Sequence, residues 1–175
     1  MRIPKSLRDE LRITLWDKAD ELGWQGLTWA QKSPLYEAWT RDPEIGGRLS
    51  HYVDQRRIRV YLKDTIMKGY VRARQADPER PLKAVRIDPE SPMAEAYERP
   101  HGRRLEDGRV ISWGNADDWK LVLMAVHERS YDADNGVPFA SVLFSANGKY
   151  AEPSVREVVQ DAANMLRIKK LVWLH

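Results

Sequence analysis

The sequence predicts an α+β fold in which a helical N-terminal half is followed by a small mixed sheet flanked by helices, in the order αβββαβ. Apolar residues recur at three-and-four spacing in the first half of the chain, prolines crowd its middle, and short apolar runs separated by Gly, Asn and Asp fill the last third. We expect a single domain over residues 1–175. Its sub-regions are a helical part over 1–75, a proline-rich connection over 76–108 and an α/β part over 109–175.

The first predicted helix spans residues 6–22, where leucines and alanine recur on one face. Ser6 is its expected N-cap, with Asp9 three residues later in the position of a capping box. Glycines follow the segment at once, and glycine commonly ends a helix. The pattern therefore predicts an amphipathic helix with one buried face.

A second, shorter helix is expected from Pro34 through Trp39, with Ser33 as its N-cap. Proline suits the first helical position, where its missing N–H has no partner to lose. Thr28 and Gln31 also have the spacing of a capping box, but a helix that started there would carry Pro34 in its interior.

Residues 48–74 form the longest helical pattern, with Ile58 and Leu62 on one apolar side and Met67 on nearly the opposite side. Basic residues flank both sides, which indicates a helix held between two layers with charged edges. A strand through residues 58–62 is the alternative, since apolar residues there also alternate with a period of two.

Positive charge is concentrated on this segment. Residues 55–75 hold seven basic residues and one acid, whereas residues 81–175 hold 13 basic and 14 acidic residues. Such a local excess favours a polyanionic partner, and nearby tyrosines supply rings on which bases can stack. The predicted nucleic-acid contacts are Arg56, Arg57, Arg59, Lys63, Lys68, Arg72, Arg74, Tyr52 and Tyr70.

The last third reads as a meander that ends in a helix and a strand. Two strands are expected at 109–113 and 138–145, a helix after Pro153 and a final strand at 171–174. The almost unbroken apolar run from Trp119 to Val126 is interpreted as the middle strand of the meander. A buried helix over 119–129 is the alternative, because Asn115 and the acids after it also form a good helix start.

A hairpin turned at 114–118 would place Glu106 and Asp107 opposite His127 and Glu128 at one end of the sheet. Three carboxylates and an imidazole there suit a Mg²⁺ site, with Asp107 and Glu128 as metal ligands. Such a site activates water against a phosphodiester, and Lys120 or His127 would position it. The candidate catalytic residues are Glu106, Asp107, Lys120, His127 and Glu128.

Composition excludes several classes of protein. The 175 residues include no Cys, which removes disulfides, thiol nucleophiles, iron–sulfur clusters and Cys-ligated zinc. Charged residues make up 31% of the chain and no apolar run approaches the length of a bilayer crossing. The charged start of the chain differs from a secretory signal, so a soluble, cytoplasmic protein with no membrane partner is expected.

Three functions remain. The first is a nucleic-acid-binding protein or subunit that contacts phosphate backbones through the basic helix. The second is a Mg²⁺-dependent phosphodiesterase or nuclease, the one case that needs a cofactor. The third is a protein-interaction or regulatory subunit, with a protein partner or a homo-oligomer, in which the basic edge is paired within the chain itself.

Overall fold

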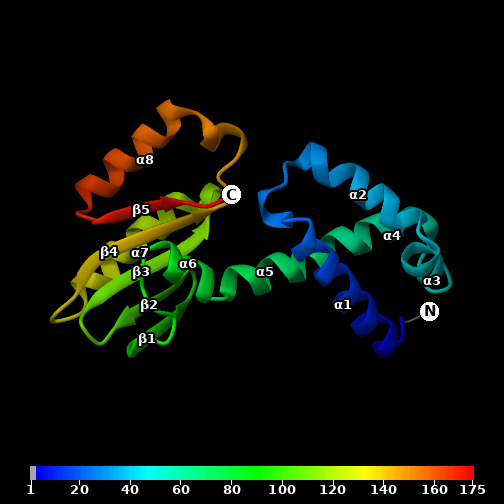
Figure 1. Ribbon diagram of the computed structural model, residues 1–175, viewed down its shortest axis with the longest axis horizontal. Coiled ribbons are helices and arrows are strands. Elements are labelled where there is room, and N and C mark those ends of the chain that lie inside the picture. The colour runs from blue at the N-terminus through cyan, green and yellow to red at the C-terminus, as the bar shows by residue number, and fades with distance from the viewer. Residues whose placement is uncertain (1–2) are drawn as a thin grey trace. The chain divides into compact units, whose positions relative to one another are not determined.

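The computed structural model describes residues 3–175. The chain divides between Arg74 and Gln75 into an N-terminal unit of helices and a C-terminal unit built on a five-stranded sheet (Figure 1). Helices run from residue 5 to residue 84, and a mixed sheet with two packed helices follows. The predicted α+β fold, a helical half before a mixed sheet flanked by helices, is therefore confirmed.

In the described residues of the N-terminal unit, every regular element is helical. Its elements are α1 (Lys5–Glu21), a 3₁₀ turn (Trp24–Gly26), α2 (Trp29–Arg41), a π turn (Pro43–Gly47), α3 (Arg48–Ser50), α4 (Gln55–Tyr61), a π segment (Leu62–Met67) and α5 (Lys68–Ala76). We call the continuous run α4, π segment and α5 the long helix. Leucines of α1 and apolar residues of the long helix form one core with Trp24 and Trp39, whose rings stack at 5.1 Å.

The helix starts differ from the predicted caps. α1 begins at Lys5 after Pro4, so Ser6 lies inside the first turn and caps nothing. α2 begins after Thr28, whose side chain accepts from Gln31 N while the Gln31 side chain accepts from Thr28 N. The helix continues through Pro34, which has no N–H and so cannot donate the hydrogen bond to the carbonyl one turn earlier. The prediction of Ser33 as N-cap was therefore wrong. The capping box satisfies two N–H groups at the start of the helix, whereas Pro34 removes one hydrogen bond from its interior.

The basic segment is helical, as predicted, and the alternative strand through 58–62 is absent. The long helix begins at Gln55, because residues 51–53 form a turn and the Asp54 carboxylate accepts from Arg56 N at 2.9 Å. The π segment adds one residue to a turn, so Met67 follows Leu62 by one full turn. Met67 is consequently 1% exposed in the core, on the side where a regular wheel would not place it.

The C-terminal unit carries a sheet of order β1-β2-β3-β4-β5. β1 to β3 are antiparallel, and β3 to β5 are parallel. Its elements are α6 (Glu79–Ala84), β1 (Met93–Glu98), β2 (His101–Leu105), β3 (Arg109–Asn115), a 3₁₀ turn (Ala116–Asp118), α7 (Trp119–Tyr131), β4 (Val137–Phe144), a 3₁₀ turn (Gly148–Ala151), α8 (Pro153–Met165) and β5 (Lys170–Trp173).

The strand interpretation of the apolar run after Asp118 was wrong, and the alternative helix is present as α7. The Asn115 side chain accepts from Asp117 N at 2.9 Å and so turns the chain out of β3. β3 finds its partners in β2 and β4 instead. Counted from α6, the element order is αβββαβαβ, which contains the predicted order αβββαβ. However, the first two strands, β1 and β2, lie within residues 76–108, where a proline-rich connection was predicted.

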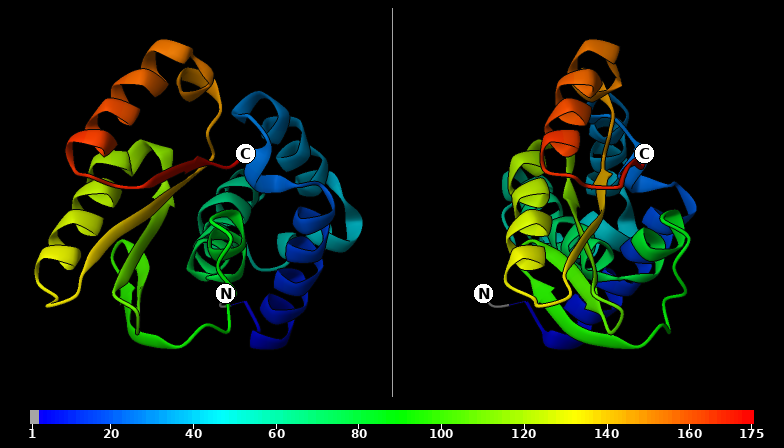
Figure 2. Two further views of the ribbon diagram at one scale, coloured as in Figure 1. Left: turned by 60° about the vertical axis from the view of Figure 1, so that its left-hand side comes forward. Right: turned by 90° about the vertical axis from the view of Figure 1, so that its left-hand side faces the viewer.

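The sheet is covered on both faces (Figure 2). Val110, Leu143 and neighbouring residues pack against α7 and α8. Ile111, Val142 and Phe144 pack on the opposite face against apolar residues of α6 and of the segment that follows it. Parallel strands joined by helices are buried on both faces, and this explains why β4 is an almost continuous apolar run without alternation.

Candidate nucleic-acid interface

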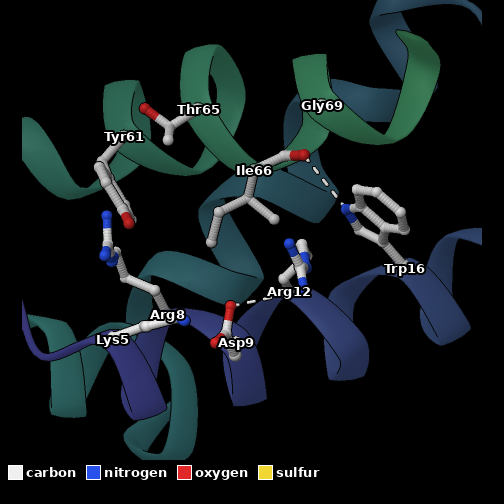
Figure 3. A pocket seen from close by; sticks show the side chains of 9 residues that line it. All are labelled: Lys5, Arg8, Asp9, Arg12, Trp16, Tyr61, Thr65, Ile66 and Gly69. Carbon is white, nitrogen blue, oxygen red and sulfur yellow. Dashed lines mark hydrogen bonds and ion pairs between the residues drawn. The ribbon is translucent and has the colours of Figure 1, made fainter. Parts of the chain in front are cut away.

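The N-terminal unit carries a groove of about 480 Å³ between α1 and the long helix (Figure 3). Side chains of α1 form one wall, and the end of α4, the π segment and the start of α5 form the other. The lining residues are Lys5, Arg8, Asp9, Arg12, Trp16, Tyr61, Thr65, Ile66 and Gly69.

The α1 wall is a regular stripe. Lys5, Arg8, Arg12 and Trp16 follow one another at intervals of three, four and four residues, which places them on one face of the helix. The leucines of α1 point to the core from an adjoining face. We did not predict this site, because the leucine pattern accounted for the whole helix, although the spacing of the cations was visible in the sequence.

Positive charge in the groove is only partly compensated. Lys5 and Arg8 are exposed, and neither makes an ion pair with any residue between 3 and 175. Arg12 pairs with Asp9 at 3.4 Å, and its guanidinium lies 5.7 Å from the centre of the Trp16 ring. Because both members of that pair are solvent-exposed, the pair itself contributes little stability and can open at little cost.

The opposite wall carries hydroxyl groups. Tyr61 is half-buried; burial raises the pKa of its phenol, and the positive charge of Arg8 lowers it in part. The phenol therefore stays protonated and can donate a hydrogen bond. Thr65 is exposed one turn further along, in the π segment. Figure 3 shows the Tyr61 hydroxyl facing Arg8 of α1 across the groove, whereas the Thr65 hydroxyl points away from α1.

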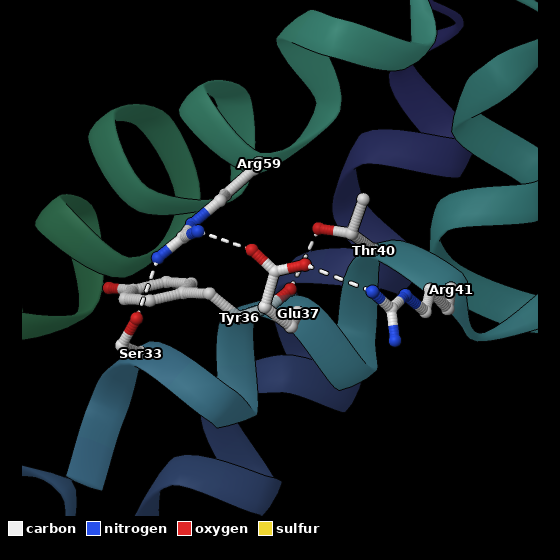
Figure 4. Close-up of polar contacts among 6 residues, drawn as sticks. All are labelled: Ser33, Tyr36, Glu37, Thr40, Arg41 and Arg59. Carbon is white, nitrogen blue, oxygen red and sulfur yellow. Dashed lines mark hydrogen bonds and ion pairs between the residues drawn. The ribbon is translucent and has the colours of Figure 1, made fainter. Parts of the chain in front are cut away.

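Two of the predicted basic contacts are occupied within the unit. Arg59 pairs with Glu37 and donates to Ser33 Oγ at 2.8 Å, so its charge joins the long helix to α2 (Figure 4). Arg74 holds the carboxylate of Asp20 with two of its nitrogens. These two residues have structural partners that a phosphate would have to displace.

The other five predicted cations are less engaged. Lys63 lies 3.7 Å from Asp64 in an exposed pair and 5.7 Å from the ring of Trp29. Arg57 lines a second groove of about 410 Å³ that shares Tyr61 and Thr65 with the first. Within residues 3–175, no ion pair is formed by the exposed side chains of Arg56, Arg57, Lys68 and Arg72.

Tyr70 does not have the predicted stacking geometry. It is 3% exposed, its ring meets Trp16 edge-on at 6.0 Å, and its hydroxyl donates to Asp20 at 2.7 Å. Burial raises its pKa to about 12. A base cannot reach this ring, because the period of the helix turns it into the core. Tyr52 is half-buried against the same core and lines the second groove.

The predicted catalytic residues are distributed over two elements. Glu106 and Asp107 are exposed in the β2–β3 turn, where Asp107 accepts from Arg109 N at 3.1 Å and from Arg109 Nε at 2.8 Å. His127 and Glu128 are exposed near the end of α7. Lys120 lies at the start of α7, about 10 Å along the axis from His127.

The predicted cluster of these residues requires a hairpin at 109–126, and α7 replaces the second strand of that hairpin. Successive residues of a helix point around its axis instead of lying along one strand end. In the part of the chain that the structure describes, no three His, Asp or Glu side chains lie together as a metal site requires. Asp107 and Glu128 are therefore not members of such a group.

No family model matches the chain, and neither a curated protein nor a solved structure does. Among residues 3–175, no helix combines the length and the apolar character needed to cross a bilayer. The groove and its charges are therefore the features from which function is inferred.

Proposed function

We propose that this protein binds nucleic acid, and that the groove of the N-terminal unit contacts the phosphate backbone. The observation that carries the proposal is the presence of two cations, Lys5 and Arg8, that line the groove and have no acidic partner among the described residues. Lysine and arginine bind phosphate well because their charge replaces condensed counterions. The hydroxyl of Tyr61 faces Arg8 and is a suitable donor to the same oxygens.

The distribution of charge along the chain supports the proposal. Residues 1–74 hold 15 Lys and Arg against 10 Asp and Glu, whereas residues 75–175 hold 14 against 16. The N-terminal unit therefore has a net positive charge that attracts a polyanion, and the C-terminal unit does not.

A salt titration of the full chain tests the proposal. Each cation that contacts a phosphate contributes about 0.7 to the slope of log affinity against log salt for a single strand, and about 0.9 for a duplex. The variant Lys5→Gln with Arg8→Gln should therefore bind labelled oligonucleotides more weakly and lower this slope by about 1.4 to 1.8.

The control variant removes the same total charge elsewhere. Lys18 and Lys169 are exposed, lie outside the groove and make no ion pair with a described residue. Lys18→Gln with Lys169→Gln should leave the slope within a few tenths of that of the parent chain. Equal losses in the two double variants would mean that only net charge matters, and the groove would lose its role.

The four free cations of the long helix extend the proposal. If the ligand also follows this helix, replacing Arg56, Arg57, Lys68 and Arg72 by Gln lowers the slope further, by about 0.7 for each contact. Arg59→Gln should instead reduce stability, because it breaks the contacts with Glu37 and Ser33.

A further inference from the structure

The groove contains more than phosphate binding requires. Beside the cations it holds the aromatic side chains of Trp16 and Tyr61, one from each wall. Arg12 lies over Trp16, and Arg8 lies close enough to Tyr61 to affect its pKa. Aromatic rings and guanidinium planes are the groups on which unpaired bases stack. A duplex keeps its bases stacked inside and would not use them.

The shape of the groove also discriminates between strands. Proteins that read duplex DNA usually insert a protruding helix or ribbon into a major groove about 12 Å wide. Here the recess lies in the protein, between two helices of one packed unit. A recess between two helices suits one extended chain, whereas the phosphates of a duplex lie on a wide cylinder.

We propose that the groove binds single-stranded nucleic acid. This inference rests on the proposed function and specifies its substrate. A phosphate occupies the end lined by Lys5 and Arg8, within reach of the Tyr61 hydroxyl, and a base lies toward Arg12 and Trp16 at the other end. The two ends are about 16 Å apart along α1, which is room for a few nucleotides.

Asp9 supplies a direct test of occupancy. Its carboxylate is the one acidic group that lines the groove in the described residues, and it holds Arg12 at 3.4 Å. A bound phosphate is repelled by this carboxylate and competes with it for Arg12. A unit charge at about 5 Å in water changes a binding constant about fourfold, so Asp9→Asn should tighten single-strand binding by about that factor.

The matched control for this variant is Asp17→Asn. Asp17 belongs to the same helix, is exposed, does not line the groove and makes no ion pair with a described residue. The two substitutions change the net charge identically. Asp9→Asn alone should therefore increase affinity, and thermal unfolding of both variants verifies that the fold is intact.

Three probes of one length complete the experiment with the full chain: a single-stranded oligonucleotide, the same strand in a duplex, and a strand whose sugars carry no bases. Stacking of one base is worth roughly fivefold or more in affinity. We expect the base-bearing single strand to bind at least fivefold more tightly than either other probe, and Asp9→Asn to increase that affinity.

The outcomes separate the two proposals. If all three probes bind equally and Lys5→Gln with Arg8→Gln weakens all of them, the groove binds phosphate but the single-strand inference is wrong. Tighter binding of the duplex would overturn the inference in the same way. If the double variant leaves binding of every probe unchanged, the proposed function itself fails.

Discussion

The indole N–H of Trp16 donates a hydrogen bond to the carbonyl oxygen of Ile66 at 3.3 Å. Ile66 belongs to the π segment of the long helix, so this bond ties α1 to the distorted turn across fifty residues of chain. π segments are frequent at functional sites, and this one forms part of the groove wall. Trp16 thus has a structural role at the end of the proposed binding site.

Replacing Trp16 by Phe should destabilise the N-terminal unit by about 1–2 kcal/mol, because it removes the bond to Ile66 and part of the buried ring. Hydrogen exchange of α1 amides in the full chain measures this change locally. Trp29→Phe is the control, since Trp29 is 58% exposed and should alter stability by less than about 0.5 kcal/mol. A larger effect at Trp29 would contradict the assignment.

Asp20 should make the N-terminal unit sensitive to acid. Its hydrogen bond from Arg74 lowers its pKa below 3.8, with a smaller contribution from Tyr70. A carboxylate with a lowered folded pKa stabilises the fold fully above the range in which the unfolded group titrates. That contribution disappears as the pH falls below about 4 through the folded pKa.

Urea unfolding at several pH values tests this expectation. Asp20→Asn should be less stable than the parent chain at pH 7, by no more than about 1 kcal/mol because the pair is partly exposed. The difference should shrink as the pH falls from 5 to 2. A difference that stays constant over this range would show that the carboxylate charge is not the cause.

The two proposed helix caps give opposite expectations. Thr28→Ala removes the capping box of α2 and should cost about 1 kcal/mol. Ser6→Ala removes a hydroxyl that caps nothing in α1 and should be neutral or slightly stabilising, because alanine is the better helix former. Thermal unfolding of both variants distinguishes them, and a loss at Ser6 would restore it as the cap.

Ser141 and Ser112 are paired in β4 and β3 and are both fully buried, but they differ in hydrogen bonding. Among residues 3–175, Ser141 Oγ has no hydrogen-bond partner, whereas Ser112 Oγ accepts from Arg129 at 2.9 Å. Ser141→Ala should therefore leave stability unchanged or raise it by up to about 1 kcal/mol.

Ser112→Ala should cost about 1–2 kcal/mol, because Arg129 is partly desolvated and would lose an acceptor. Denaturant unfolding followed in the C-terminal unit measures both variants. A loss at Ser141 as large as that at Ser112 would indicate a partner for the Ser141 hydroxyl, such as a buried water.

Part of the candidate site could be predicted from the sequence. The surplus of basic residues on the segment from Arg56 to Arg74 was visible as a count, and the helix that carries them is present. Which of these cations are free could not be predicted, because Arg59 and Arg74 find their acidic partners on other helices. Ion pairs between distant segments leave no pattern in the sequence.

Local patterns determined the class of the fold, the first helix and the helical state of the basic segment. They also determined the strands β3 to β5 and the helix α8. Each of these features depends on periodicity and turn residues that lie close together in the chain. The apolar run that became α7 was ambiguous, because residues 121–126 are apolar on every face and such a run fits a helix or a strand equally well. Tertiary structure decided it by pairing β3 with β2 and β4, and it also decided the groove. Lys5, Arg8 and Tyr61 form one surface only because the leucines of α1 pack against the long helix. A sequence pattern of short period contains no information about such long-range packing.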